Sequence, residues 1–364
     1  MVRHGGDAAD GGEVVPLFLS QGAQTAVEIA ERLAAFISAA ERTLDLALYD
    51  FRLSPPQGRI VADALRERSA AGVEIRIAYD ADKPEQPTWE RGHDPAPGGT
   101  GEFVRNLGLP YRRIGGEKLM HHKYLVRDAG APEARIWTGS LNLTDDAFRL
   151  QENNVLELAT PLLAEYYARN FEEMWSEQNF EESGAFDTRI VHLVYRGEPV
   201  RVRLLFSPGR GPSIDYDVAH RVANARRRVK VCSMLLNSGA LLAALNDVLR
   251  DDQVEVDGVY DETQMRGVLK QWETVPRNRW KIRAVETIVE HAHLAGKDST
   301  PYSPATPHDF MHNKVLIVDD LVITGSYNFS HSAELNAENI LMLESPALAA
   351  AYSEYVDELI RRYR

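Results

Sequence analysis

Cysteine is almost absent from this chain, since Cys232 is the only one in 364 residues. A single thiol excludes a disulfide framework or a cysteine-based metal cluster within the chain. In the apolar run VKVCSMLLN we expect that thiol to be part of the core. Long hydrophobic runs are missing too: no stretch approaches the roughly 18 apolar residues of a membrane-spanning helix. The polar N-terminus lacks the apolar part of a signal peptide, so we expect a cytoplasmic protein without a transmembrane segment.

An excess of basic charge is also lacking. Lys and Arg number 41 against 54 Asp and Glu, which gives a net charge of −13. This balance argues against indiscriminate nucleic-acid binding, although a few basic side chains can still line one positive pocket on an acidic body. With 44% hydrophobic residues, the chain has enough apolar surface for two ordinary domains or one large one.

What the chain does contain is one segment written twice. MHHKYLVRD occupies residues 120–128, and MHNKVLIVD occupies residues 311–319. Each copy sets a His, a Lys and an Asp at positions i, i+2 and i+7. The six residues are His121, Lys123, Asp128, His312, Lys314 and Asp319.

Further landmarks repeat in the same order. VEIRIAYD (73–80) matches VEVDGVYD (254–261), and TGSLNLT (138–144) matches TGSYNFS (324–330). In each half an acidic–amide pair follows the GSxN glycine by 13 residues, which aligns Glu152 and Asn153 with Glu338 and Asn339. Matching order and spacing indicate an internal duplication.

Alternating helical and strand periods predict an α/β domain present twice. We expect a helix over 60–72 and matching helices that close the two halves at 162–178 and 347–364. The Pro/Gly-rich segments 80–101 and 291–309 are expected to be irregular. The predicted division is a flexible N-terminus over 1–13, a first domain over 14–185 and a second over 186–364.

The repeated motif places cations where a strand would normally be apolar. Residues i and i+2 of a strand share a face, so each His projects beside its Lys, an arrangement that suits a phosphate between them. The GSxN segments add neutral donors for the same anion: Ser140, Asn142, Ser326 and Asn328. Asp128 and Asp319 have the opposite strand parity, so we expect them to brace the strand end rather than to touch substrate.

HHKYLVRD with GSLN and HNKVLIVD with GSYN resemble the two motifs of the phospholipase D superfamily in its single-chain form. The resemblance implies two similar α-β-α sandwich lobes related by a pseudo-twofold axis, with an active site at their interface that uses no metal or cofactor. It implies that one imidazole attacks phosphorus while the other protonates the leaving group. Lys123 and Lys314 would stabilise the phosphoryl oxygens, and Glu152 and Glu338 would each orient an imidazole. His121 is the nucleophile that the family's commoner pattern favours.

The substrate is left open between two classes of phosphodiester. A glycerophospholipid is favoured, with hydrolysis or transfer to an alcohol as the outcome and peripheral membrane contact as a consequence. The alternative is a nuclease on DNA or RNA, which needs a basic groove; the candidates for it are Arg105, Arg112, Arg113 and Lys118. A phosphate-binding module without catalysis is a third interpretation. Because both half-sites lie in one chain, a monomer is expected, and segments 80–101 and 291–309 are expected to select the substrate.

Overall fold

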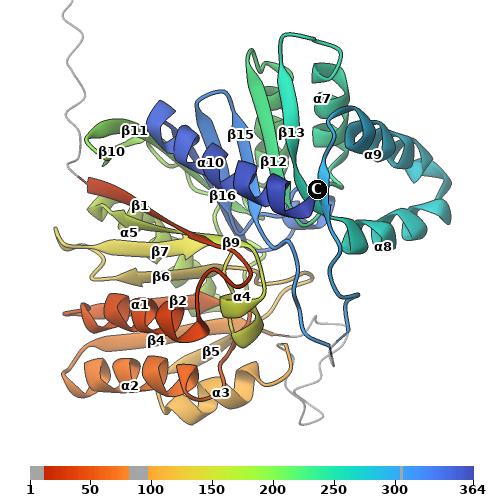
Figure 1. Ribbon diagram of the computed structural model, residues 1–364. Coiled ribbons are helices and arrows are strands. Elements are labelled where there is room, and N and C mark those ends of the chain that lie inside the picture. Colours follow the sequence, from red (N-terminus) through yellow and green to blue (C-terminus); the bar gives the residue numbers. More distant parts are fainter. Residues whose placement is uncertain (1–11, 82–96, 304–305) are drawn as a thin grey trace, which may run out of the picture.

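The computed structural model describes residues 12–81, 97–303 and 306–364, and it forms two halves of similar construction (Figure 1). The elements of the first half are β1 (Gly12–Leu19), α1 (Ala26–Ser38), β2 (Thr43–Leu48), β3 (Phe51–Arg52), α2 (Gln57–Ala70), β4 (Glu74–Asp80), α3 (Thr100–Leu107), β5 (Tyr111–Ile114), β6 (Lys123–Arg127), β7 (Arg135–Gly139), β8 (Leu143–Thr144), α4 (Asp145–Arg149), β9 (Asn153–Ala159) and α5 (Pro161–Glu177).

The second half repeats this plan. Its elements are β10 (Val191–Tyr195), β11 (Glu198–Ser207), α6 (Gly211–Ala223), β12 (Arg228–Ser233), α7 (Gly239–Val248), β13 (Glu255–Asp261), α8 (Glu262–Glu273), the 3₁₀ turn η2 (Pro276–Asn278), α9 (Arg279–His291), β14 (Ala295–Lys297), β15 (Lys314–Val318), β16 (Leu321–Gly325), the 3₁₀ turn η3 (His331–Glu334), β17 (Glu338–Glu344) and α10 (Pro346–Tyr363).

Strand order makes the duplication explicit. One half runs β9-β7-β6-β2-β4-β5 and the other β17-β16-β15-β12-β13-β14, so the motif strands β6 and β15 hold equivalent central places. The two sets of strands are joined through β11, β10 and β1 into one hydrogen-bonded order. This confirms the predicted α/β fold with two similar lobes. The domain boundaries at 13/14 and 185/186 stay a prediction, and residues 1–11 lie outside the described residues.

The closing helices begin at matching prolines. Pro161 follows Thr160, and Pro346 follows Ser345, and each proline occupies the first turn of its helix. Proline suits that position because its missing N–H would have no partner there and its φ is already helical. The predicted spans of 162–178 and 347–364 are therefore confirmed to within a residue.

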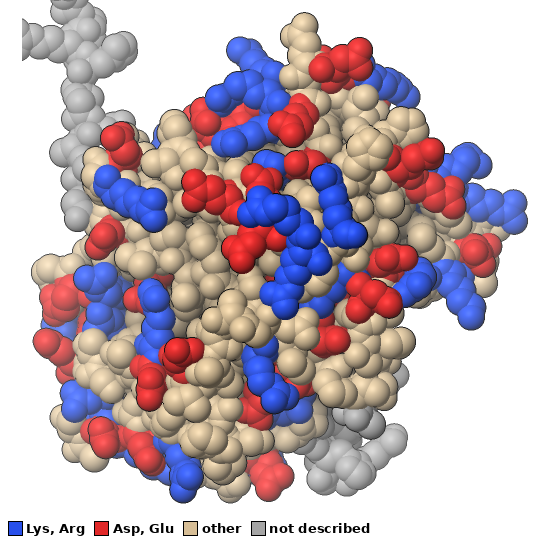
Figure 2. Space-filling model, in the orientation of Figure 1, with Lys and Arg blue, Asp and Glu red and all other residues tan. Residues whose placement is uncertain are grey.

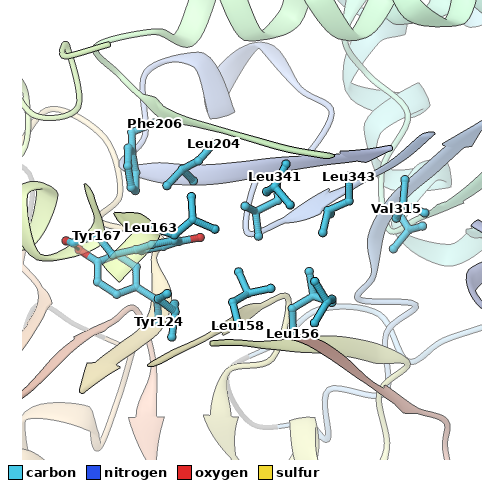
Figure 3. Close-up of a cluster of buried hydrophobic side chains, with 14 of the residues drawn as sticks. Tyr124, Leu156, Leu158, Leu163, Tyr167, Leu204, Phe206, Val315, Leu341 and Leu343 are labelled. Atoms are coloured by element: carbon cyan, nitrogen blue, oxygen red, sulfur yellow. Dashed lines mark hydrogen bonds between the residues drawn. The ribbon is translucent and has the colours of Figure 1, made fainter. Parts of the chain in front are cut away.

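The largest hydrophobic cluster lies between the halves (Figure 3). Leu156 and Leu158 of β9 face Leu204 of β11 and Leu341 and Leu343 of β17, and all five side chains are fully buried. Each half also has one hydrophobic cluster of its own under its outer helices. Cys232 is buried in the cluster between the halves, as predicted. A core that both halves build fixes how they meet, which is what a site at their interface requires.

The segment predicted to be irregular over 291–309 is partly ordered. It includes β14, in which Ala295 and Lys297 pair with β13 in parallel register. The sequence AGK has weak strand propensity, so its extended conformation depends on hydrogen bonding to the neighbouring strand β13. The corresponding 80–101 segment falls mostly on residues outside the described ranges, and α3 begins at its end. Within the described residues, no helix combines the length and the apolar character needed to cross a bilayer.

Candidate active site

The two motif histidines are held by backbone contacts that cross between the halves. The amide of His121 donates to the carbonyl of Ala337 at 2.9 Å, and the amide of His312 donates to the carbonyl of Glu152 at 3.1 Å. Both side chains are buried, with 6% of each exposed. Each half thus presents its histidine on a segment that the other half anchors.

The imidazoles have different partners at Nδ1. His121 Nδ1 lies 2.8 Å from Glu338 Oε2, whereas His312 Nδ1 lies 3.0 Å from Asn153 Oδ1. Both acceptors are oxygens, so each ring donates from Nδ1 and leaves Nε2 unprotonated when neutral. A carboxylate partner raises the basicity of Nε2 more than an amide partner does. The site is therefore electronically asymmetric although the fold is nearly symmetric.

Glu152 does not contact an imidazole, which corrects the prediction from spacing. Its carboxylate instead forms an ion pair of 2.5 Å with Lys297 and accepts a hydrogen bond from the Tyr363 hydroxyl. The physical reason is register: Gly139 pairs with Val155, whereas Gly325 pairs with Ile340, so the first half has one extra residue in this turn.

The true equivalent of Glu338 is Asn153, and the sequence held a signal for it. Each lies eight residues before the proline that begins the closing helix, Pro161 or Pro346. Counting back from the helix start gives the right alignment because β9 and β17 run into those helices without insertion. Counting forward from the glycine crosses the loop where the extra residue lies.

The motif lysines are buried beside the histidines. Lys123 Nζ donates to the carbonyl of His121 and Lys314 Nζ to that of His312, each at 2.6 Å. Burial lowers the pKa of Lys123 to about 7 against the attraction of Glu338, and burial together with Lys123 lowers the pKa of Lys314 well below its usual value. Burial is the main cause of both shifts, and at Lys314 the neighbouring ammonium group of Lys123 adds to it.

The histidines respond to the same environment. Burial and then the nearby Lys123 and Lys314 lower the pKa of His121 and of His312 well below the ordinary imidazole value. Burial raises the pKa of Glu338 to about 8, against the charge of Lys123. An anion bound between the two lysines would oppose the shifts of the cationic groups, because opposite charge favours their protonated forms.

The GSxN residues divide into two groups. The Ser140 hydroxyl donates to Asn153 Oδ1 at 2.8 Å, and the Ser326 hydroxyl accepts from the Asn339 amide at 3.0 Å, so both serines order the histidine-bearing framework. Asn142 and Asn328 each have a buried Oδ1 without a hydrogen-bond partner among the described residues. Phosphate binding by these four residues stays a prediction.

A second buried network was missed in the sequence. Asn339 Nδ2 contacts His122 Nδ1 at 3.4 Å, and in the matching place Asn154 Nδ2 donates to Asn313 Oδ1 at 2.9 Å. His122 and Asn313 are the residues directly after the motif histidines, and both are fully buried. A polar residue at this position in both copies was the available signal.

Asp128 and Asp319 lie at the end of their strands and brace the chain. Asp128 accepts from the amides of Glu41, Arg42 and Thr43. Asp319 does the same for the amides of Arg226, Arg227 and Arg228. This is the bracing arrangement that strand parity predicts, and neither Asp has a hydrogen bond to a motif His or Lys.

The aromatic ring of Tyr49 lies beside His121, a contact that sequence reasoning did not single out. The Tyr49 ring lies 4.8 Å from the His121 ring, and Lys123 Nζ lies 5.0 Å from the Tyr49 ring. Tyr302 is 67% exposed and stacks near His308, with ring centroids 5.2 Å apart. Within the ranges that the structure describes, no three His, Cys, Asp or Glu side chains are grouped as metal ligands would be.

The family described as "Cardiolipin synthase, PLD-like domain" matches this chain twice, over residues 33–175 and 218–360. The chain belongs to the phospholipase D-like family. Members of this family are phosphodiesterases and phospholipid-modifying enzymes, and the two matched regions each contain one motif His, one Lys and one GSxN segment.

Individual phospholipase D-like relatives match parts of the chain. A mitochondrial cardiolipin hydrolase of Xenopus laevis is 30% identical over 146 residues, which is 40% of this chain and 60% of that protein's own length. A phospholipase D of Rickettsia prowazekii is 54% identical over 43 residues, or 11% of this chain and 21% of the relative. The phosphatidylserine synthase of Haemophilus influenzae matches in fold over 96% of this chain and 86% of its own, with a TM-score of 0.65 at 13% identity.

Proposed function

We propose that this protein cleaves or transfers a phosphodiester through a phosphohistidine intermediate without a metal, with a glycerophospholipid as substrate and one chain as the active unit. The observation that carries the proposal is the pair of buried imidazoles with unlike Nδ1 partners, Glu338 for His121 and Asn153 for His312. Two lysines beside them supply the positive charge that phosphoryl transfer needs.

The unlike partners support distinct roles. Glu338 polarises the His121 ring, so its Nε2 lone pair attacks phosphorus and forms the P–N bond. His312 takes up an Nε2 proton when the phosphate anion binds; because it lacks a carboxylate partner, it holds this proton less tightly and gives it to the leaving oxygen as the P–O bond breaks. Neutral His312 then takes a proton from water or an alcohol, whose oxygen attacks phosphorus and releases His121. Lys123 and Lys314 stabilise the non-bridging oxygens throughout.

A lipid substrate is supported by the relatives. The cardiolipin hydrolase and the phosphatidylserine synthase carry names of enzymes that act on phospholipids. The chain's net charge of −13 also disfavours a polyanionic polymer as the general partner.

A nuclease is the second candidate, and one observation favours it. The exposed ring of Tyr302 lies 5.2 Å from His308, which stacks on the buried Phe310, and such exposed rings take bases in single-strand binders. The basic groove expected for a nuclease gains little from Arg112, however. Its guanidinium donates to the carbonyl of Trp175 and lies over that ring, so it is committed to α5.

The test is a paired assay of the purified protein in EDTA. One arm contains phosphatidylcholine, phosphatidylglycerol or cardiolipin vesicles with and without a primary alcohol, and the other contains single- and double-stranded DNA and RNA. We expect phosphatidic acid, or a phosphatidyl alcohol, and its loss in His121→Ala and in His312→Ala. The exposed His291→Ala serves as the matched control. Activity retained in either motif variant would contradict the two-histidine mechanism, and cleaved nucleic acid alone would make the protein a nuclease.

A further inference from the structure

The segment between β13 and β14 forms a helical hairpin of α8, η2 and α9, residues 262–291, which we call the basic hairpin. It lies outside the sheet at one side of the second half, and Lys and Arg side chains project from this edge (Figures 1 and 2). The hairpin as a whole, residues 262–291, contains six Lys or Arg and four Glu, and within 264–285 the same six basic residues face a single Glu, whereas the chain as a whole has a net charge of −13. Positive charge is therefore concentrated here against the overall balance.

Most of this charge is not neutralised locally. Some arginines elsewhere on the surface sit beside acids, as Arg32 does with Glu157 at 3.0 Å. In the basic hairpin Arg266 pairs with Asp298 at 2.7 Å near the base. Exposed basic residues that form no ion pair with a described residue are Lys270, Arg277, Arg279 and Arg283. Three of these four cluster within seven positions at the tip.

An indole accompanies the arginines. Trp280 is 42% exposed and lies between Arg279 and Lys281 at the start of α9. Val275 and Ile282, close by in the chain, are only partly buried. An amphipathic ring flanked by basic residues is the combination found where helices rest on a membrane surface.

The hairpin begins and ends beside the active site. It leaves from Asp261, whose carboxylate accepts from the Met311 amide next to His312. It returns to β14, whose Lys297 contacts Glu152. The start of α9 is tied to the loop of the second GSxN segment, because Lys281 donates to the carbonyl of Asn237 at 3.1 Å and the Asn237 amide donates to Phe329.

We propose that the basic hairpin docks the protein on an anionic phospholipid bilayer and so brings the mouth of the site to the lipid headgroups. The proposal rests on the proposed lipid activity for its purpose, but the docking itself is measurable without catalysis. A bilayer fits better than a nucleic acid because the charge is confined to a short helical tip with an exposed indole. A strand-binding surface needs a basic path that continues toward the catalytic residues.

The experiment compares three proteins by co-sedimentation with vesicles of phosphatidylcholine alone or with 30% phosphatidylglycerol. The test protein carries Arg277→Glu, Arg279→Glu and Arg283→Glu. The control carries the same charge change at exposed arginines outside the hairpin, as Arg42→Glu, Arg59→Glu and Arg189→Glu. Each basic residue near an anionic surface contributes about fivefold to binding, so we expect the test protein to bind at least about 100-fold more weakly and the control to bind nearly as the parent does.

Turnover on a short-chain phosphatidylcholine below its micellar concentration is measured in parallel and should be equal in all three proteins. Parent binding to anionic vesicles that is weakened by 0.5 M salt and lost only in the test protein would support docking, even if no lipid is turned over and the proposed activity fails. Equal loss in test and control, no binding by the parent, or a hairpin-dependent affinity for single-stranded DNA in place of vesicles would each overturn it.

Discussion

At the scale of single residues, the two halves are alike in backbone and different in chemistry. Glu338 and Asn153 occupy equivalent places on β17 and β9, yet one brings a buried carboxylate to a histidine and the other an amide. A duplicated fold can assign different roles to its two histidines by changing the group behind each ring. The imidazole itself stays the same.

Exchanging these partners should separate the two roles. Glu338→Gln removes the carboxylate behind His121. We expect kcat to fall by about 100-fold, because an imidazole hydrogen-bonded to an amide is a weaker nucleophile than one hydrogen-bonded to a carboxylate. Asn153→Asp places a negative charge beside His312, which favours its protonated form and raises its pKa. The alkaline limb of the pH–rate profile should then move to higher pH by about one unit. Unchanged profiles in Asn153→Asp, with both proteins folded by circular dichroism, would contradict the assignment.

Anion binding should be coupled to proton uptake. In this site the pKa values of His121, His312 and Lys314 are lowered by burial and mutual repulsion, and that of Lys123 falls to about 7. A bound anion raises them, so more protons are held in the complex than in the free protein, and affinity must weaken as pH rises. Calorimetry with tungstate in buffers of different ionisation enthalpy should give an uptake of about one proton near pH 8. An uptake of zero would show that the anion binds elsewhere.

The sequence predicted those site residues that a repeated spacing reveals, and it missed those whose role depends on a contact between distant segments. His121, Lys123, His312 and Lys314 were found because chemistry repeated at a fixed interval inside single strands. Glu152 was misassigned because one additional residue in a loop cannot be seen by counting across it. His122 was passed over because its importance arises from a partner on β17, which no local pattern records.

At the scale of elements, the aspartates of the two motifs act on backbone rather than substrate. Asp128 adopts a positive φ of 56°, and its carboxylate gathers the amides that lead into β2. The matching Asp319, at φ 53°, does this for β12. In each motif the histidine precedes the start of the motif strand, and the aspartate fixes the other end of that strand to the start of its neighbour, β2 or β12.

Removing one brace should cost stability and leave the chemistry intact. Asp128→Ala strips acceptors from three amides at a buried position, and we expect the free energy of unfolding to fall by about 2–4 kcal/mol. Asp128→Asn should recover most of this loss, because three of the four hydrogen bonds go to a single oxygen, Oδ1. Urea unfolding measures the change, with Asp320→Ala as control, a half-buried aspartate that follows Asp319 in the other half. A loss of kcat in folded Asp128→Asn would instead indicate a direct part in the reaction.

The sequence predicted those elements whose periodicity was local. The closing helices α5 and α10 were placed well because an amphipathic pattern follows a proline in each case. β14 was missed because three weak strand formers depend on β13 for their structure. The basic hairpin was not predicted as a unit. What distinguishes it is exposed positive charge, and the sequence was searched mainly for apolar periodicity and repeated motifs.

At the scale of the whole molecule, the halves are joined by a shared core and by polar contacts that converge on the site. β1 bridges the two sets of strands, and the cluster around Leu156 and Leu341 excludes water between them. The backbone of each motif histidine is bonded to the opposite half. A change in how the halves meet is therefore a change in how the two imidazoles lie relative to each other, which links global stability to the geometry of the site.

The ion pair between Glu152 and Lys297 is the sharpest test of that link. It joins the first half to the second, with 0% and 3% of the two side chains exposed, and Tyr363 of α10 completes it. Lys297→Met leaves a buried carboxylate uncompensated, and we expect a loss of about 3–5 kcal/mol in the free energy of unfolding. Because the Glu152 carbonyl accepts from the His312 amide, kcat should fall as well.

Adding Glu152→Gln to Lys297→Met removes the stranded charge, so much of the lost stability should return. Arg266→Met, which breaks an exposed pair with Asp298 in the same region, should cost less than about 1 kcal/mol. Chemical unfolding of the parent, Lys297→Met, Glu152→Gln and the double variant gives the coupling energy directly, and Arg266→Met is measured beside them. If Lys297→Met unfolded no more easily than Arg266→Met, the buried ion pair would contribute nothing to the association of the two halves. The apolar cluster alone would then determine how the two histidines are placed.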